Sequence, residues 1–314
     1  MISFVEWKMS IRLLILINRQ SVEHHAVIRQ PIPGYSGISV TFLQICQMQK
    51  HVGIRQDDFL LTLRVDVVKH AKVLARILHD HSMNDGLDDF LGSFDDKSVV
   101  GIMGGHGLSR LDESYRKVVM ISKKLTEGGS LMVSGGGPGA MEATHLGAWL
   151  AGRSESDIEE ALQMLSAAPG YKDKLWLESA FRVMERFPSP RYVSLGVPTW
   201  LYGHEPATPF ATHIAKYFDN STREDTILTI AKGGVIYSPG SAGTMQEIFQ
   251  DAVQNHYLSF GYASPMVFLG KEFWTEEMPV YRLMQYLIDK GKYNNLLLSI
   301  SDSADEIVRT IEDF

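Results

Sequence analysis

The sequence predicts an α/β fold, a doubly wound and mostly parallel sheet covered by helices on both faces. From residue 98 onward, short and almost wholly apolar segments alternate with segments of helical periodicity. Strands that read as continuous apolar runs are typical of parallel sheets buried on both faces, and their alternation with helices indicates crossover connections. In addition, three of the apolar runs end directly in glycine-rich turns, as strands do where a helix follows closely.

The individual elements follow from this pattern. Strands are expected over residues 98–103, 130–133, 192–197, 234–237, 265–269 and 296–300. Helices are expected over residues 112–125, 140–151, 244–257 and 303–312. A charged stretch, 155–186, has a helical pattern broken by Pro169 and Gly170, so a helical insertion is predicted at about 153–190. Residues 96–314 are therefore predicted to form one Rossmann-like domain.

Residues 1–95 differ from the rest and are predicted to be an N-terminal extension of mixed α and β structure. They contain six of the eleven histidines and no glycine-rich loop. A short strand is expected at 11–17 and a helix at 58–79, while the acidic segment 83–96, with two glycines, suggests a linker. The histidines lack the pair spacing of a zinc helix, so surface or packing roles are expected and no metal site is predicted.

Composition excludes several classes of protein. The chain has 314 residues, is 45% hydrophobic and carries a formal net charge of −7, which argues against a nucleic-acid coat. The single cysteine, Cys46, cannot form an internal disulfide and fits a reducing compartment. The apolar run at 11–17 is too short to span a bilayer. We therefore expect a cytoplasmic protein with neither a membrane nor a nucleic acid as its partner.

Two glycine loops are candidates for binding a phosphate. One follows the strand at 130–133 as Gly-Gly-Gly-Pro-Gly (135–139), and the other follows the strand at 234–237 as Pro-Gly-Ser-Ala-Gly-Thr (239–244). Each opens a helix, whose N-terminal N–H groups and partial positive charge attract anions. Because both lie at carboxyl ends of strands in one open sheet, where ligands bind in this fold class, the pair predicts a phosphate-bearing ligand.

The spacing of these glycines excludes two common nucleotide sites. The Gly-x-x-x-x-Gly-Lys-Ser/Thr pattern of P-loop NTPases does not occur in the chain. The loop at 135–140 partly imitates a dinucleotide fingerprint, but no acidic residue ends a strand about 20 residues later to bind a ribose. NAD is therefore not expected.

Two charged residues near the second loop are candidates for chemistry. Glu247 follows Thr244 by three residues on the helix that this loop opens, so its carboxylate would face the same crevice. The alternative for Glu247 is a capping box, because Thr-x-x-Glu is its signature. Arg223 precedes the helix that leads into the strand at 234–237, and its alternative is a surface ion pair with Glu224 or Asp225. The spacing alone leaves these alternatives open.

The two loops together resemble the LONELY GUY (LOG) family. Ser134-Gly-Gly-Gly-Pro-Gly-Ala-Met-Glu142 and Pro239-Gly-Ser-Ala-Gly-Thr-Met-Gln-Glu247 are similar to the family's glycine-rich loop and its Pro-Gly-Gly-x-Gly-Thr-x-x-Glu motif. The resemblance covers about residues 98–270 and is to the longer bacterial members, many of which were once labelled lysine decarboxylases. It implies a phosphoribohydrolase (a hydrolase, or nucleosidase) that cuts nucleoside 5′-monophosphates into free base and ribose 5-phosphate, without a cofactor or metal.

The resemblance also assigns roles to residues. It implies that Arg223 and Glu247 form the catalytic pair. The residues implied to hold the phosphate and ribose are Gly136, Gly137, Gly139, Gly240, Ser241, Gly243 and Thr244, with Glu142 as a ribose candidate. Tyr202, His204 and Glu205, in the proline-rich loop 198–209, are candidates for a base-binding or lid element; packing or a dimer contact is the alternative there. The family resemblance further implies a homodimer or a dimer-based assembly.

Two residues depart from the family pattern. Ser241 stands where the motif has its second glycine, which is expected to alter phosphate affinity. Glu224 follows the arginine where many members have lysine, and this bears on the preferred substrate. A nucleotide-binding or nucleotide-cofactor carrier protein without hydrolysis is therefore the alternative function. The decarboxylase label gains no support, since no Ser-x-His-Lys for a pyridoxal phosphate occurs in the chain.

Overall fold

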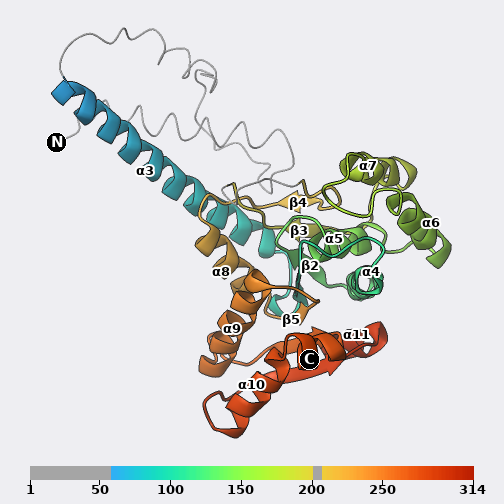
Figure 1. Cartoon of the computed structure of the whole chain (residues 1–314). Coiled ribbons are helices and arrows are strands. Elements are labelled where there is room, and N and C mark those ends of the chain that lie inside the picture. The colour runs from blue at the N-terminus through green and yellow to red at the C-terminus, as the bar shows by residue number, and fades with distance from the viewer. Residues whose placement is uncertain (1–57, 201–206) are drawn as a thin grey trace.

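The computed structural model describes residues 58–200 and 207–314, with side chains from residue 71 onward. A single sheet of seven parallel strands, in the order β4-β3-β2-β1-β5-β6-β7, forms its centre (Figure 1). The strands are β1 Val99–Met103, β2 Leu131–Ser134, β3 Ser194–Gly196, β4 His213–Ile214, β5 Gly234–Tyr237, β6 Pro265–Leu269 and β7 Leu297–Ser301. The predicted doubly wound α/β fold is therefore confirmed.

The strand order reverses between β1 and β5. The chain runs from β1 outward through β2, β3 and β4, then returns to pair β5 with the free side of β1. In open α/β sheets such a reversal leaves a crevice at the carboxyl ends of the two central strands, where ligands bind. In this chain the glycine loops after β1 and β5 lie at that reversal, with the loop after β2 beside them.

Helices cover both faces of the sheet. On one face lie α4 Glu113–Glu127, α5 Ala140–Trp149 and α11 Ala304–Glu312, and the insertion α6 Glu155–Leu165 and α7 Trp176–Arg186 packs beyond them. On the other lie α3 Asp58–Leu91, α8 Asn220–Ile230, α9 Ala242–Tyr257 and α10 Val280–Asp289. A 3-10 turn, η1 Asp96–Ser98, and a π-helical turn, η2 Phe273–Glu277, complete the elements.

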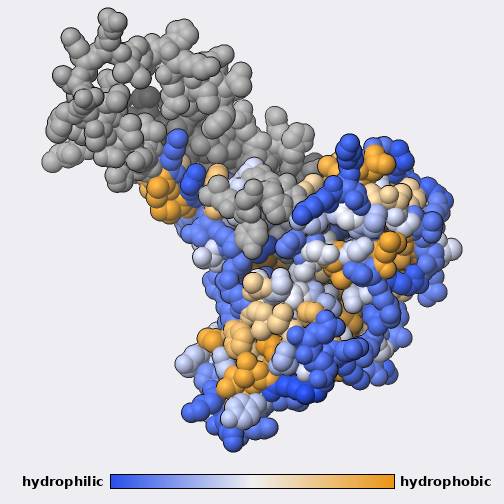
Figure 2. All heavy atoms as spheres, in the orientation of Figure 1, coloured by the Kyte–Doolittle hydropathy of each residue, from blue (hydrophilic) through white to orange (hydrophobic). Residues whose placement is uncertain are grey.

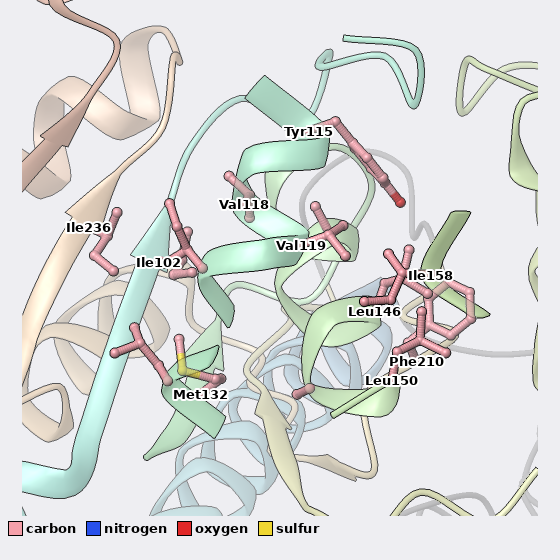
Figure 3. Close-up of a cluster of buried hydrophobic side chains, with 14 of the residues drawn as sticks. Ile102, Tyr115, Val118, Val119, Met132, Leu146, Leu150, Ile158, Phe210 and Ile236 are labelled. Carbon is pink, nitrogen blue, oxygen red and sulfur yellow. The ribbon is translucent and has the colours of Figure 1, made fainter. Parts of the chain in front are cut away.

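Alternation along the strands divides the core into two layers. On β1, Val100 and Ile102 belong to the layer beneath α4 and α5, whereas Val99 and Met103 belong to the opposite layer. Figure 3 shows the first layer, with Ile102 and Ile236 of the sheet near Val118 of α4. All five residues of β1 are buried, as a central parallel strand requires.

The extension does not end in a linker. Helix α3 is 34 residues long and continues through the acidic segment expected to be a linker, ending at Leu91. The segment stays helical because Met83 and Leu87, four residues apart, are 6% and 2% exposed in the second core layer. The strand expected at 11–17 lies outside the described residues.

The N-terminal part of α3 leaves the domain as a projecting helix (Figure 1). Val73, Leu74 and Ile77 are exposed on this part, and Figure 2 shows apolar side chains gathered there. Within residues 58–200 and 207–314, no helix combines the length and apolar character that crossing a membrane requires.

Candidate active site

Three glycine loops meet at the carboxyl edge of the central strands. The loop after β1 connects the other two, because the Gly105 amide donates to the carbonyl of Pro239 (2.9 Å) and the Gly105 carbonyl accepts from the amide of Ala140 (3.2 Å). Gly104 has no room for a side chain, since a Cβ there would lie 2.7 Å from Cβ of Ala140 and 2.9 Å from Cβ of Ser238. The site is thus built from loops after β1, β2 and β5.

Close packing explains several of these glycines. Gly139 has φ +70°, and a Cβ there would collide with the Gly105 carbonyl oxygen. A Cβ on Gly240 would likewise collide with the Thr244 hydroxyl. Glycine is thus required at both positions, and it brings the N-termini of α5 and α9 to the same edge of the sheet. Two helix N-termini at one edge can bind an anionic group through their amides.

The other predicted phosphate residues lie in the same place. Gly136, with φ +70°, and Gly137 are buried in the loop before α5. Gly243 has open space where a side chain would lie, Thr244 is buried, and Ser241 is exposed at the N-cap of α9. The structure therefore brings these residues together around the start of α5 and α9.

The capping-box interpretation of Thr244 and Glu247 is wrong. Helix α9 begins at Ala242 with Ser241 as its N-cap, and Ser241 makes no side-chain cap hydrogen bond. Thr244 therefore lies inside the first turn of the helix and cannot be its N-cap. Glu247 is free of any capping role, and its side chain lies one turn further along the buried face of α9.

Arg223 joins three elements of the site. It lies within the first turn of α8, which begins at Asn220 behind the N-cap Asp219, and not before the helix as the sequence indicated. Its Nε donates to the carbonyl of Val197 after β3 (2.7 Å), and its Nη2 donates to the carbonyl of Gly135 after β2 (3.0 Å). Its Nη1 lies 4.0 Å from Oε1 of Glu247.

The ion pair of Arg223 with Glu224, which was the alternative, is present but does not lie at the surface. The side chain is only 12% exposed, and although Nη1 lies 3.9 Å from Oε1 of Glu224, that carboxylate is itself buried. Glu224 accepts hydrogen bonds from Nδ2 of Asn220 (2.8 Å) and Nε2 of Gln246 (2.5 Å). Two buried carboxylates, Glu224 and Glu247, thus flank one guanidinium.

Glu247 has the properties of a group that exchanges protons near neutral pH. Its residue is 9% exposed. The pKa of this carboxyl is raised to about 7, because burial outweighs the opposing charge of the Arg223 guanidinium and the charge of Glu224 acts in the same direction as burial. A carboxyl with such a pKa, held at a ligand-binding edge, is a candidate for acid–base chemistry.

A second buried carboxyl lies one turn further along α9. Asp251 accepts a hydrogen bond from the hydroxyl of Tyr237 (2.6 Å), and burial raises its pKa to about 7. Burial, the charge and hydrogen bond of Asp251, and the charge of Glu247 together raise the pKa of Tyr237 well above its ordinary value. Tyr237 keeps its proton as a donor, so Asp251 is held in the core beneath the site.

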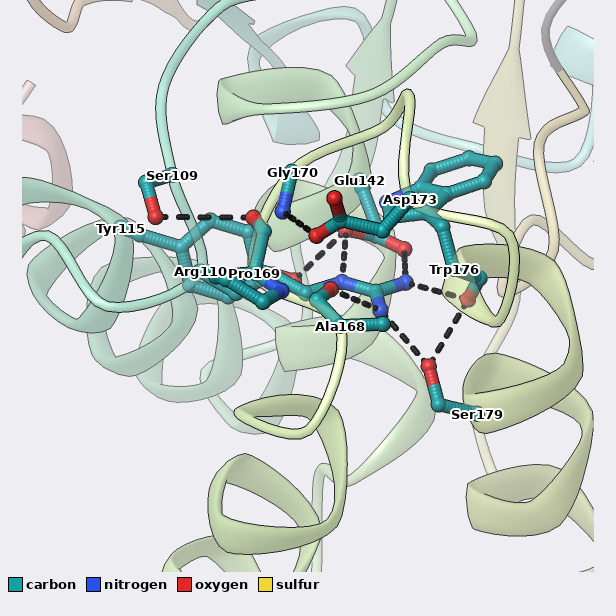
Figure 4. A network of polar contacts seen from close by, with 10 residues as sticks. All are labelled: Ser109, Arg110, Tyr115, Glu142, Ala168, Pro169, Gly170, Asp173, Trp176 and Ser179. Atoms are coloured by element: carbon teal, nitrogen blue, oxygen red, sulfur yellow. Dashed lines mark hydrogen bonds and ion pairs between the residues drawn. The ribbon is translucent and has the colours of Figure 1, made fainter.

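The structure does not bring Glu142 to the carboxylate and guanidinium of the site. It forms a buried ion pair with Arg110, whose Nε donates to Oε2 of Glu142 (2.9 Å), and Oε2 also accepts from the Tyr115 hydroxyl (3.0 Å) (Figure 4). Arg110 further donates to the carbonyls of Ala168 (3.0 Å) and Trp176 (3.1 Å). Glu142 thus ties α5 to the helical insertion.

Replacing Glu142 by alanine should therefore reduce stability more than ligand binding. The change leaves the Arg110 guanidinium buried without its carboxylate, which typically costs about 3–5 kcal/mol. Denaturant unfolding of the variant measures the loss. The matched control is Glu159→Ala, which removes an exposed partner of Arg116 and should cost less than about 1 kcal/mol. Equal losses in the two variants would contradict this role for Glu142.

Part of the predicted site cannot be placed. Tyr202, His204 and Glu205 lie outside the described residues, so their predicted role in base binding stays a prediction. Conversely, the part played by Gly104 and Gly105 was not foreseen. The sequence does show glycines directly after the first strand of the domain. Because they match no dinucleotide fingerprint, no binding role was predicted for them. Among the described residues, no group of three or more His, Cys, Asp or Glu side chains is arranged to hold a metal ion.

Comparison with known proteins finds similarity only among solved structures. No family model and no curated protein matches the chain. A molybdenum cofactor binding protein from the phototrophic bacterium Rippkaea orientalis has 13% sequence identity and a TM-score of 0.42, covering 68% of this chain and 95% of its own. The molybdenum cofactor carrier protein of Chlamydomonas reinhardtii has 15% identity and a TM-score of 0.42, covering 68% and 96%.

A third solved structure, of the protein TM1055, has 20% identity and a TM-score of 0.44, covering 69% of this chain and 99% of its own. At such identities the likeness concerns the general fold and assigns no ligand or activity to this chain.

Proposed function

We propose that this protein is a nucleoside 5′-monophosphate phosphoribohydrolase, which hydrolyses the N-glycosidic bond to give a free base and ribose 5-phosphate. The observation that carries the proposal is the buried Arg223–Glu247 pair at the edge where three glycine loops meet. The resemblance of the two loop motifs to the LOG family supports the same activity. The base is an adenine, as in AMP or a cytokinin-type AMP, or that of GMP or a pyrimidine nucleotide.

The mechanism begins with the phosphate. The amides at the N-termini of α5 and α9 bind it, together with the hydroxyl of Thr244, and this remote binding energy positions the sugar. Breaking the bond between C1′ and the base nitrogen builds positive charge on the sugar. The ionised Glu247 carboxylate stabilises that charge and accepts a proton from the water that attacks C1′. The base leaves with the bonding electron pair and takes up a proton.

Arg223 acts mainly by fixing other protein groups, and not by binding the substrate. Two of its nitrogens are hydrogen-bonded to the carbonyls of Val197 and Gly135, so the guanidinium is fixed relative to the ends of β2 and β3. From that position its Nη1 faces Glu247. Arg223 therefore holds the carboxylate in place and balances its charge when Glu247 ionises.

The pH dependence follows from the pKa of Glu247. Because the ionised form is the active one and burial raises its pKa to about 7, kcat/KM should fall about tenfold per pH unit below 7 and level off above it. The expected profile has one ascending limb, measured by base release between pH 5 and 9. A limb centred near pH 4.5, the ordinary value for glutamate, would contradict the role given to the buried carboxyl.

A panel of nucleotides tests the function. Purified protein is incubated with AMP, GMP, IMP, CMP, UMP and an N6-prenylated AMP, and free base and ribose 5-phosphate are followed by chromatography. Release of base from at least one nucleotide is expected, and the relative rates rank the bases. Inactivity toward every nucleotide, in protein that is folded and binds them, would refute the hydrolase.

The second candidate function is a nucleotide or nucleotide-cofactor carrier without hydrolysis. Two observations favour it. Arg223 donates hydrogen bonds to two backbone carbonyls, and the buried Glu224 lies beside it. The site is therefore less positive than one with the arginine followed by lysine, as in many LOG family members. Calorimetry separates the two candidates, since a carrier binds nucleotide tightly and releases no base.

A homodimer is part of the same proposal. Val253 and Tyr257 on α9 and Leu283 and Tyr286 on α10 are exposed large apolar side chains, and Figure 2 shows apolar residues gathered over this region. Burying such residues against a second copy would be favourable. Light scattering of the full chain measures the assembly, and a monomer at working concentrations would contradict it.

A further inference from the structure

The C-terminal half of α3 docks against the turn that leads into α8. Met83 and Leu87 pack into the core layer shared with β5 and β6. Oδ1 of Asn84 accepts a hydrogen bond from the hydroxyl of Tyr217 (2.8 Å), and the ring of His79 lies edge-on against Phe218 with centroids 4.9 Å apart. The extension is thus packed onto the turn that precedes Arg223.

Asp80 makes the most specific of these contacts. Its two carboxylate oxygens accept hydrogen bonds from consecutive backbone amides, Oδ1 from Phe218 (2.9 Å) and Oδ2 from Asp219 (2.8 Å). Nδ1 of His79 lies 2.9 Å from the same Oδ1 and helps to orient the carboxylate. Asp80 is only 6% exposed, so its charge has been removed from water and depends on these donors.

Hydrogen bonds lead from Asp80 to Arg223, whose Nη1 lies 4.0 Å from the candidate catalytic carboxylate of Glu247. The amide of Asp219 is held by Asp80, and the carbonyl of Asp219 accepts from the amide of Arg223 (3.0 Å). The side chain of Asp219 caps α8 by accepting from the amide of Ser221 (2.9 Å). Arg223 then extends to the carbonyls of Val197 and Gly135 and faces Glu247.

We propose that Asp80 is a positioning residue for the Arg223–Glu247 pair, and that the C-terminal half of α3 is therefore part of the functional unit. The proposal rests on the proposed function, in which Arg223 holds Glu247 in place. It revises the division of the chain at residue 95, because a carboxylate from the extension fixes where α8 begins. Asp80 contacts neither phosphate loop. It therefore affects the geometry of the Arg223–Glu247 pair and not the affinity for the nucleotide.

Kinetics of the full chain with Asp80 replaced by asparagine test the proposal. Asparagine keeps the size of the side chain but presents only one acceptor oxygen to two amide donors. Turnover should fall about tenfold or more, because small misplacements of reacting groups are costly. KM should change less than about twofold, because the phosphate loops are intact. Asp80→Ala, which removes both acceptors, should lower turnover at least as far.

The matched control is Tyr217→Phe. It removes the hydrogen bond between α3 and the same turn but leaves the amides of Phe218 and Asp219 on Asp80. Its turnover should equal that of the wild type, and thermal unfolding of all variants shows whether stability alone accounts for the difference. If Tyr217→Phe lost as much turnover as Asp80→Asn at equal stability, the contact would be merely structural and the proposal overturned.

A readout without activity separates this proposal from the function on which it rests. Hydrogen exchange of the Arg223 Nε–H, followed by NMR, reports its bond to the Val197 carbonyl. In Asp80→Asn this exchange should accelerate about tenfold relative to both the wild type and Tyr217→Phe. If the wild type hydrolyses no nucleotide, the proposed function fails while this measurement still decides the positioning. Unchanged exchange in Asp80→Asn would overturn the positioning itself.

Discussion

Replacing Glu247 by glutamine should reduce base release by about 10²-fold or more while nucleotide binding is retained. Glutamine has nearly the same shape, so the packing on α9 survives. It cannot carry the negative charge that stabilises the developing cation, nor can it accept the proton of the attacking water. Steady-state kinetics measures the loss of turnover, and calorimetry with the preferred nucleotide measures the affinity.

The control for this substitution is Asp251→Asn. It also exchanges a buried carboxyl on α9 for an amide, one turn away, where the partner is the Tyr237 hydroxyl. Because Asp251 lies in the core beneath the site, its replacement should leave turnover within a few-fold of the wild type. If both variants lost activity equally, the effect would come from disturbing buried charge, and the special role of Glu247 would be contradicted.

Arg223→Lys should have the second large effect, on both activity and stability. A lysine keeps the positive charge but lacks the planar fork that donates in two directions to the Val197 and Gly135 carbonyls. With two charge-assisted hydrogen bonds lost or weakened, the free energy of unfolding should fall by about 3 kcal/mol. Turnover should fall by about 10²-fold, because Glu247 and the ends of β2 and β3 lose their common anchor.

Denaturant unfolding and steady-state kinetics check the two parts of this prediction. Arg116→Ala is the control for stability. Arg116 forms an exposed ion pair with Glu159, so this variant should lose far less unfolding free energy than Arg223→Lys. Wild-type turnover in Arg223→Lys would show that positive charge alone suffices at this position and would contradict the anchoring role.

Much of the fold could be predicted because the strands are apolar and bounded by glycine or proline. The expected bounds of β5 and β6 agree with the structure. Strand β4 was missed because it is only two half-buried residues, His213 and Ile214, which leave no pattern in the sequence. The end of α3 was misread because its acidic residues and glycine resemble a linker, while the packing of Met83 and Leu87 that keeps it helical is tertiary.

The candidate site was predictable only in part, for a similar reason. Motif spacing indicates that the glycine loops open helices, and the structure places them at one edge. Spacing does not show that the loop after β1 joins them, because that depends on the pairing of Gly105 with Pro239 across the strand reversal. Nor does it show that Glu142 faces Arg110, since that ion pair depends on how the helical insertion folds back.

The most direct test of the account is the stoichiometry of products from one nucleotide at pH 8. The 314-residue chain is incubated with the nucleotide that it binds most tightly by calorimetry, in parallel with Glu247→Gln, and base and ribose 5-phosphate are quantified together. The account predicts equal amounts of the two products from the wild type and at least about 10²-fold less from the variant. Tight nucleotide binding with no product from the wild type would contradict it and establish the carrier function instead.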